Sequence, residues 1–284
     1  MSVFFVILAS VLFGCIPTLQ EHIMLSGASP LGLVIVCNSV ASLAALIAGL
    51  IRRESFRLDL KTAVSLLLTG AVGLFFTDFL LNLAYTLLPV GFVTMIHFLY
   101  PTLVCLIMAV CFREKLTGGK LGAIVCSAAG LILLSGGSFS GSGKGILVAI
   151  STAFAYSFYI VANDRLPVGK IPLMARSFYL NLIVALMALC LNGVTHSAVL
   201  PQAAGDLGLS ILTGCLISTA VILLNAGIGK LGAAKAGFLN MLEPVISLIV
   251  STMVYHYSVT AAALAGCGLI LASLLLITLA DQKT

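Results

Sequence analysis

The stretch Leu224–Val245, LNAGIGKLGAAKAGFLNMLEPV, is the starting point for interpreting this chain. It is apolar enough to lie within a lipid bilayer, yet it carries a glutamate, Glu243, directly before a proline. A similar stretch, LNLAYTLLPVGFVTMIHFLYPT, lies earlier at Leu81–Thr102. Because both stretches place a proline at the same point, we interpret them as two copies of one apolar segment.

The two copies differ in the polar side chains that they carry. The aligned pairs are Asn82 with Asn225, His97 with Asn240, Tyr100 with Glu243, and Pro101 with Pro244. The first copy has a histidine and a tyrosine before its proline, where the second has an asparagine and a glutamate. Asp78, just before the first copy, aligns with an apolar residue, Val221. This pattern predicts a nearly symmetric backbone around an asymmetric set of polar groups.

The composition is that of an integral membrane protein. Hydrophobic residues make up 61% of the 284 residues and charged residues 8%, whereas soluble domains have roughly 45–50% and 25%. A water-soluble fold has no interior large enough for so much apolar surface. The net charge of +5 comes from basic residues between apolar runs, so no nucleic-acid partner is expected. The eight cysteines show no CxxC or zinc-ligand spacing, and no metal or other cofactor is expected.

Ten apolar runs of about 20 residues are each long enough to cross about 30 Å of hydrocarbon as a helix. Helices are expected because an open strand edge in lipid leaves backbone groups unpaired. The predicted spans are 2–22, 30–51, 62–85, 89–112, 117–136, 144–164, 171–193, 206–228, 233–255 and 259–280. The first run lacks a basic n-region and a cleavage site, which favours a membrane helix over a removed signal peptide. The sequence therefore predicts an all-α integral membrane protein with ten transmembrane helices.

The basic residues of the loops predict the orientation. If the N-terminus is cytoplasmic, twelve of the lysines and arginines lie in cytoplasmic loops or in the C-terminal tail. The outer loops then hold only Lys144, and Arg176 lies inside the seventh predicted helix. Because cytoplasmic loops are enriched in lysine and arginine, both termini are expected in the cytoplasm, with the chain in the cell (inner or plasma) membrane.

The first five predicted helices resemble the last five, and Pro30 matches Pro172. An odd number of helices in each half means that the halves enter the membrane from opposite sides. The loop FREKLTGGK after the fourth span is basic, whereas its counterpart YHYSVT has no lysine or arginine. Residues 1–140 and 141–284 are thus predicted to be two inverted-topology five-helix repeats. Such repeats are typical of secondary transporters, whose substrate site lies near the bilayer midplane.

Two segments carry a resemblance to a known family: LYPTLVCLIMAVCFREKLTGGKLGAIVCSAAGLILL and LEPVISLIVSTMVYHYSVTAAALAGCGLILASLLL. Each has a proline turn, an apolar helix, a Leu-Thr or related end, and a glycine-spaced helix. The matching residues of the first copy are Glu114, Leu116, Thr117, Gly122 and Gly130. The second copy keeps Thr260 but has Tyr257 where the pattern usually has the acidic residue. The chain resembles the EamA family of the drug/metabolite transporter superfamily, which implies a ten-helix carrier, often an exporter of amino acids or other small metabolites.

Polar side chains within the predicted helices are the candidates for a substrate site, because a charge at a helix centre costs at least about 2.5–3.5 kcal/mol in a membrane. Several of them share one face of their helix, at spacings of three, four or seven residues. The candidate residues are Glu243, Asp78, His97, Tyr100, Asn82, Asn225, Asn240, Tyr156 and Tyr159. They would converge if the third, fourth, sixth, eighth and ninth predicted helices surround one cavity.

These side chains suit a polar cavity. Glu243 and Asp78 can bind a cationic group of a substrate or take up a proton, and His97 can share that proton. The three tyrosines can stack on a substrate or hold an ammonium group by cation–π contact. Alternatively, the polar groups only hydrogen-bond the helices together, and the asparagines are the main candidates for that role.

Together these features predict a secondary active transporter that moves a small polar metabolite, such as an amino acid or amine, by alternating access. Export is favoured, with protons as one option for the coupling ion; an exchanger or importer of the same fold is the alternative. From another class, a channel or an intramembrane enzyme is less consistent with the chain, which has no filter-like loop and no HExxH, GxGD or GxSxG motif. No catalytic residue is expected. The expected partners are the substrate and the lipid bilayer, around a monomer or homodimer.

Overall fold

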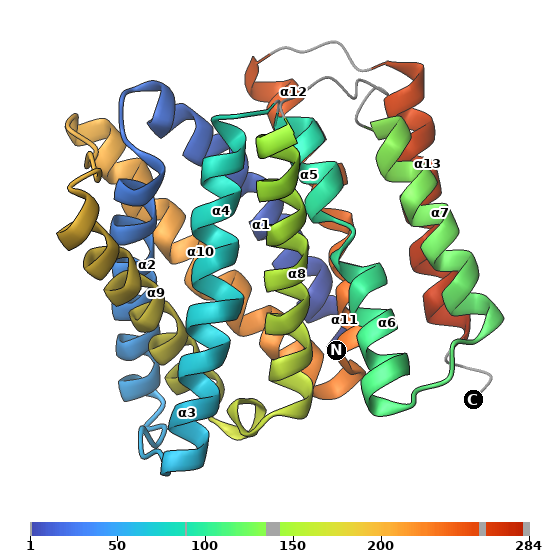
Figure 1. The fold of residues 1–284 in the computed structure, drawn as a ribbon, viewed down its shortest axis with the longest axis horizontal. Helices are drawn as coiled ribbons and strands as arrows, with labels where there is room; N and C mark the ends of the chain where they lie inside the picture. Colours follow the sequence, from blue (N-terminus) through green and yellow to red (C-terminus); the bar gives the residue numbers. More distant parts are fainter. Residues whose placement is uncertain (1, 89, 135–142, 256–259, 281–284) are drawn as a thin grey trace.

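The computed structural model describes residues 2–88, 90–134, 143–255 and 260–280 (Figure 1). Within these residues the chain is helical and has no β-strand, so the predicted all-α fold is confirmed. The elements in chain order are α1 (Ser2–Leu25), α2 (Pro30–Ile51), α3 (Leu60–Leu68), the π-helix η1 (Thr69–Phe75), α4 (Phe76–Tyr85), α5 (Val90–His97), α6 (Tyr100–Phe112), α7 (Gly118–Leu134), α8 (Gly143–Arg165), the 3-10 turn η2 (Pro167–Lys170), α9 (Leu173–Thr195), α10 (Ala204–Leu231), α11 (Ala233–Asn240), α12 (Leu242–Tyr255) and α13 (Ala261–Ala280).

Seven helical stretches of the described chain are long and apolar enough to cross a membrane by length and composition. They are Ser2–Leu25, Pro30–Ile51, Leu60–Tyr85, Gly143–Arg165, Leu173–Thr195, Ala204–Leu231 and Ala233–Val254. Shorter apolar helices are Tyr100–Phe112, Gly118–Leu133 and Ala261–Ile277. Each predicted span overlaps one of these stretches, and the expectation of a multi-pass helical membrane protein is confirmed.

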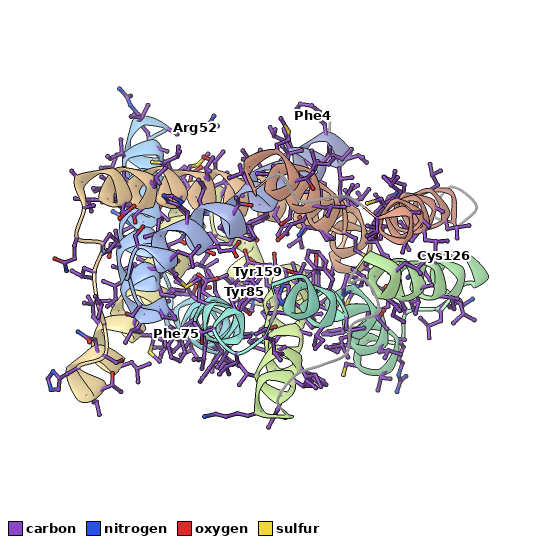
Figure 2. The ribbon with its side chains drawn as sticks, turned by 90° about the horizontal axis from the view of Figure 1, so that it is seen from above. Phe4, Arg52, Phe75, Tyr85, Cys126 and Tyr159 are labelled. Atoms are coloured by element: carbon purple, nitrogen blue, oxygen red, sulfur yellow. The ribbon has the colours of Figure 1, made fainter. Side chains whose placement is uncertain are left out.

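The helices pack into an elongated bundle, with α7 and α13 side by side at one edge and α2, α9 and α10 at the other (Figure 1). Near the centre, α1 packs against α10, α11 and α12, while α8 packs against α4, η1, α5 and α6. Seen from above, Phe4, Arg52 and Cys126 lie at the periphery, and Tyr85 and Tyr159 lie in the interior (Figure 2). The bundle therefore gathers polar aromatic side chains at its centre.

Two of the predicted helices are broken, and each break lies just before a proline. The first separates α5 from α6 at residues 98–99, and the second separates α11 from α12 at Met241. Proline has no backbone N–H, and its ring clashes with the carbonyl four residues earlier, here that of His97 or Asn240. The chain tightens instead: Met241 donates its N–H to the Phe238 carbonyl at 3.0 Å, only three residues back. The shared prolines thus place equivalent bends in the two copies.

A third predicted helix, 62–85, contains the π-helix η1 in its middle. Its two glycines allow close packing, since a Cβ at Gly73 would lie 2.9 Å from Tyr159 Cβ of α8, and one at Gly70 would lie 2.9 Å from Ile183 Cγ2 of α9. π-Helical turns inside α-helices occur frequently at functional sites. Here the π-turn precedes α4, which carries Asp78, and holds it against α8.

Candidate functional site

A cavity of about 80 Å³ lies between α1, α4, α5, α8, α10 and α12. By the same measure one water molecule needs roughly 10–15 Å³, so the cavity holds several waters or a small ligand. Its lining residues are Phe13, Ile16, Pro17, Gln20, Leu74, Thr77, Asp78, Leu81, Asn82, Tyr85, His97, Tyr156, Tyr159, Ile217, Val221 and Glu243. The two intramembrane carboxylates thus lie on the wall of one cavity, on α4 and α12.

Asn240 holds the Glu243 side of the cavity in place. Its Nδ2 donates to Glu243 Oε2 at 3.0 Å and to the Tyr100 hydroxyl at 3.1 Å. Tyr100 in turn donates to the Gly237 carbonyl at 3.2 Å. Ser10 Oγ lies 3.1 Å from Asn240 Oδ1, within hydrogen-bonding distance. Both amide hydrogens are therefore used, and Glu243 keeps its second oxygen for the cavity.

Asp78 is held by a residue that the sequence did not single out. Asn38 of α2 is buried, and its Nδ2 donates to Asp78 Oδ2 at 3.1 Å. Asn82, one turn after Asp78, donates its Nδ2 to the Asp78 carbonyl at 2.8 Å. Each intramembrane carboxylate is thus fixed by one asparagine amide, which leaves its other oxygen for a ligand. Asn38 is the one asparagine in the apolar run 30–51, and this isolation could have identified it as a candidate from the sequence.

His97 faces the cavity from the end of α5, and its hydrogen bond assigns its tautomer. His97 Nδ1 lies 3.0 Å from Thr152 Oγ1, and that hydroxyl donates to the Ala149 carbonyl at 2.6 Å. A hydroxyl has one hydrogen, so it accepts from His97, and Nδ1 carries the proton. In the neutral ring Nε2 is then an acceptor.

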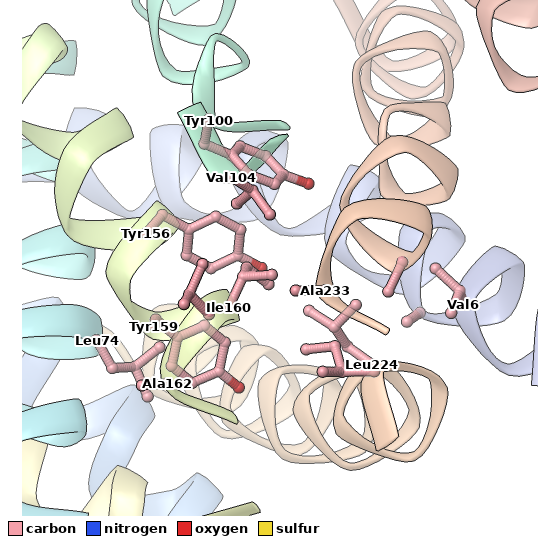
Figure 3. Close-up of a cluster of buried hydrophobic side chains, with 14 of the residues drawn as sticks. Val6, Leu74, Tyr100, Val104, Tyr156, Tyr159, Ile160, Ala162, Leu224 and Ala233 are labelled. Atoms are coloured by element: carbon pink, nitrogen blue, oxygen red, sulfur yellow. The ribbon is translucent and has the colours of Figure 1, made fainter. Parts of the chain in front are cut away.

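Aromatic side chains form one wall of the site. Tyr156 and Tyr159 line the cavity, and Tyr100 lies behind them next to Tyr156 (Figure 3). The rings of Tyr100 and Tyr156 are 4.7 Å apart in an edge-to-face arrangement, and those of Tyr156 and Tyr159 are stacked at 5.5 Å. His97 adds a fourth ring, 5.2 Å from Tyr156. This wall presents flat, electron-rich faces to anything in the cavity.

Tyr159 also forms hydrogen bonds with two asparagines, Asn225 and Asn163. Its hydroxyl donates to Asn225 Oδ1 at 3.0 Å, and its carbonyl accepts from Asn163 Nδ2 at 2.8 Å. Asn225 is fully buried, and its Nδ2 has no hydrogen-bond partner among the described residues. The Asn225 side chain therefore orients Tyr159 rather than lining the cavity itself.

The structure brings together most of the predicted site. Six of the nine candidates line the cavity: Asp78, Asn82, His97, Tyr156, Tyr159 and Glu243. The other three, Tyr100, Asn225 and Asn240, lie behind them and bind lining residues or contact their rings. The prediction missed α1, which contributes Phe13, Ile16, Pro17 and Gln20. Pro17 and Gln20, three residues apart in a mostly apolar run, could have indicated from the sequence that this helix lines the cavity. Among the described residues, no group of three His, Cys, Asp or Glu side chains could hold a metal ion.

Comparison with known proteins defines the class. The sequence matches the EamA-like transporter family over residues 1–136 and 143–279, so this chain belongs to that family of membrane transporters. It is 29% identical over 231 residues to the uncharacterized inner membrane transporter YicL of Salmonella typhimurium (strain LT2). The aligned region covers 78% of this chain and 75% of that protein. It is 25% identical over 187 residues to the uncharacterized transporter YojE of Bacillus subtilis (strain 168). This aligned region covers 66% of this chain and 61% of that protein.

One crystal structure has the same fold. It superimposes with a TM-score of 0.83, covers 99% of this chain and 98% of its own, and is 21% identical in sequence. The likeness extends over 99% of this chain, so the fold is one that another protein shares.

Proposed function

We propose that the protein is a secondary active transporter that moves a small polar metabolite across the cytoplasmic membrane by alternating access. The observation that carries this proposal is the cavity near the middle of the bundle, where two carboxylates, a histidine and three tyrosines meet in a member of a transporter family. Ionisable residues inside a membrane protein commonly mark substrate or ion pathways. Export is the proposed direction, and exchange or import is the alternative for the same fold.

Alternating access rests on two inverted repeats, and the helix contacts support them. If α1 corresponds to α8, then its contacts with α10 and α12 correspond to the contacts of α8 with α4 and α6. Likewise α2 packs on its counterpart α9, and α7 packs on its counterpart α13. The two ranges matched by the family fall one in each half of the chain. This pairing is what a two-fold axis between the repeats produces, and substrate sites of such transporters lie at that axis.

In the proposed orientation the cavity faces the outside. Its lining reaches Gln20 and Tyr85, near the ends of α1 and α4 that lead to loops poor in lysine and arginine. The opposite, basic side is closed by polar contacts between the halves. Glu54, after α2, accepts the backbone N–H groups of Met174 and Ala175 at 2.9 and 3.0 Å, at the start of α9. Opening the cytoplasmic side would require this contact to separate.

A second polar contact between the halves, here an ionic one, lies on the same side. Glu114, after α6, pairs with Arg165 at the end of α8 and with Lys120 of α7 at 3.3 Å. These side chains come from both halves of the chain, so their release would accompany a rocking of one half against the other. We propose both termini on this side, in the cell membrane, with the protein acting as a monomer or homodimer.

Protons are the proposed coupling ion. Glu243 and Asp78 each keep one oxygen toward the cavity, and His97 presents Nε2 there. A proton bound by Glu243 or Asp78 neutralises a negative charge that would otherwise attract a cationic substrate, and a proton bound by His97 adds a positive charge that repels it. Proton and substrate therefore compete for the same side chains, which is sufficient to couple their movement in opposite directions.

The test is a flux measurement with the purified protein in proteoliposomes, using a panel of metabolites with and without a pH gradient. Saturable uptake with counterflow is expected for a carrier. An ohmic ion current without saturation would instead identify a channel, and chemical conversion of a panel compound would identify an enzyme. Dependence of uphill flux on the pH gradient checks the coupling ion.

A further inference from the structure

The charges on the cavity wall have one sign. Of the lining side chains in the described chain, Asp78 and Glu243 are acids and none is a lysine or arginine. Arg176 is the one lysine or arginine among the buried described residues, and it lies outside the lining, where its Nη1 donates to the Gly169 carbonyl at 3.3 Å. A ligand in this cavity therefore meets negative charge without a compensating fixed cation.

The unused hydrogen-bonding groups on the wall are mainly acceptors. Asp78 and Glu243 each have one oxygen bound by an asparagine and one left over. Asn82 is only 2% exposed, and its Oδ1 is buried without a hydrogen-bond partner among the described residues. His97 adds Nε2, since its Nδ1 is used by Thr152. Up to four acceptors thus await a donor.

Most donors on the wall are already occupied. Thr77 Oγ1 donates to the Gly73 carbonyl at 2.6 Å, and Tyr159 donates to Asn225. The Tyr85 hydroxyl shares a hydrogen bond with Thr94, which leaves Gln20 and Tyr156 as the lining residues with an amide or a hydroxyl for a ligand. A protonated primary amine offers three N–H donors and no acceptor, which complements this wall. A carboxylate offers only acceptors and would lie beside two carboxylates.

From this balance we infer that the cavity selects a substrate that carries a protonated amine and lacks a carboxylate, so that amines are preferred over zwitterionic amino acids. The inference rests on the proposed transport function and names the substrate class of its site. The ammonium group would lie among the acceptors of Asp78, Asn82 and Glu243. The stacked faces of Tyr156 and Tyr159 would hold it by cation–π contact or pack on its apolar part.

The test compares amines with the amino acids that differ from them by one carboxylate. The pairs are phenethylamine with phenylalanine, 3-methylbutylamine with leucine, and ethanolamine with serine. Their dissociation constants are measured by calorimetry on the full-length protein in nanodiscs. The amine of at least one pair is expected to bind more tightly by about tenfold or more, the change that one lost charge interaction produces.

Two outcomes overturn the selection for amines: tighter or equal binding of the amino acid in each pair, or no binding of any amine. Counterflow of the tightest-binding compound in proteoliposomes tests the transport function separately. If that compound binds but shows no counterflow, the proposed function fails while the selection for amines stands. If amino acids bind more tightly and are transported, the transport function stands and the selection fails.

Variants connect the preference to the two acids. Asp78→Asn and Glu243→Gln are each expected to reduce the ratio of amine to amino-acid affinity by about tenfold, because each removes one negative charge from the wall. Asp206→Asn is the matched control, since this carboxylate lies in the first turn of α10 and outside the lining. Asp78→Glu keeps the negative charge, and a monodisperse elution profile shows that a variant is folded. The two together distinguish a lost charge from misfolding. An unchanged ratio in both charge variants would overturn the inference.

Discussion

The broken segments α5–α6 and α11–α12 have the same backbone arrangement and different polar side chains. Each breaks shortly before a proline, Pro101 or Pro244, and each presents a polar residue at the end of its first half. In α5 that residue is His97, which faces the cavity and is bound by Thr152. In α11 it is Asn240, which lies behind the cavity and fixes Glu243. Equivalent backbone positions therefore do different chemistry.

The difference leaves an acid in only one of the two broken segments. The position of Glu243 is taken in the first copy by Tyr100, which is fully buried and bound to Asn240 and to the Gly237 carbonyl. The tyrosine of one copy thus supports the asparagine that holds the acid of the other. The two copies thus share the position of the break and differ in the polar groups beside it.

The largest expected effect comes from Glu243→Gln. Removing this charge is expected to lower transport by about 10- to 100-fold, because hydrogen bonds to charged groups contribute about 1.5–3 kcal/mol and each 1.4 kcal/mol is a factor of ten. The amide keeps the size of the side chain and one contact with Asn240, so the fold is retained. Initial rates across a pH series measure the effect. Wild-type transport with unchanged pH dependence would contradict the assigned role.

A smaller effect is expected when the supporting asparagine is removed. Asn240→Leu removes the amide that donates hydrogen bonds to both Glu243 and Tyr100. We expect transport to fall by about tenfold, because one hydrogen bond to a charged group is lost. Asn38→Leu removes the corresponding contact of Asp78. It is the matched comparison and is expected to have the weaker effect, because Asn38 donates to the side chain of Asp78 alone, whereas Asn240 donates to those of Glu243 and Tyr100. Equal losses in the two variants would show that Tyr100 adds nothing to the Glu243 side.

The prolines test the symmetric part of the comparison. Pro101 and Pro244 lie in the first turns of α6 and α12, where proline is tolerated, and Pro101→Ala and Pro244→Ala each restore a backbone N–H that would let the preceding helix continue. Each variant is therefore expected to leave the melting temperature nearly unchanged and to slow transport by a similar, few-fold factor, since a continuous helix bends less readily. Melting curves and turnover rates measure both. A strong effect in one variant only would mean that the two bends are not equivalent.

The smallest effect is expected from Tyr100→Phe. The ring keeps its edge-to-face contact with Tyr156, and only the hydrogen bonds to Asn240 and Gly237 are lost. A neutral hydrogen bond contributes about 0.5–1.5 kcal/mol, so transport is expected to fall by about two- to tenfold, with pH dependence unchanged. A loss as large as that of Glu243→Gln would show that the first copy carries chemistry equivalent to that of the second.

Much of the site followed from the residues alone. A carboxylate in an apolar helix is costly, so Glu243 and Asp78 were recognisable as functional candidates, and both line the cavity. Tyr156 and Tyr159 followed from their spacing on one helical face and lie on the same wall. Asn38 did not follow, because its partner Asp78 lies on another helix and helical periodicity does not report which helices become neighbours.

The positions of the helix breaks were also beyond the sequence pattern. A proline can kink a helix, but the apolar runs 89–112 and 233–255 gave no sign that the helices end and begin again. The π-turn η1 was equally hidden. It includes Gly73, which packs closely on Tyr159, a contact between distant segments.

Residue composition and pattern were enough to predict a helical membrane protein whose halves resemble each other, and to find the ionisable groups within the apolar spans. These properties depend on local composition and on the cost of burying charge in lipid. The packing of the helices brings Asp78 and Glu243 to one cavity, places an asparagine beside each of them, and adds α1 to the wall. Those features depend on packing between helices, where glycines and prolines set how closely and at what angle distant segments meet.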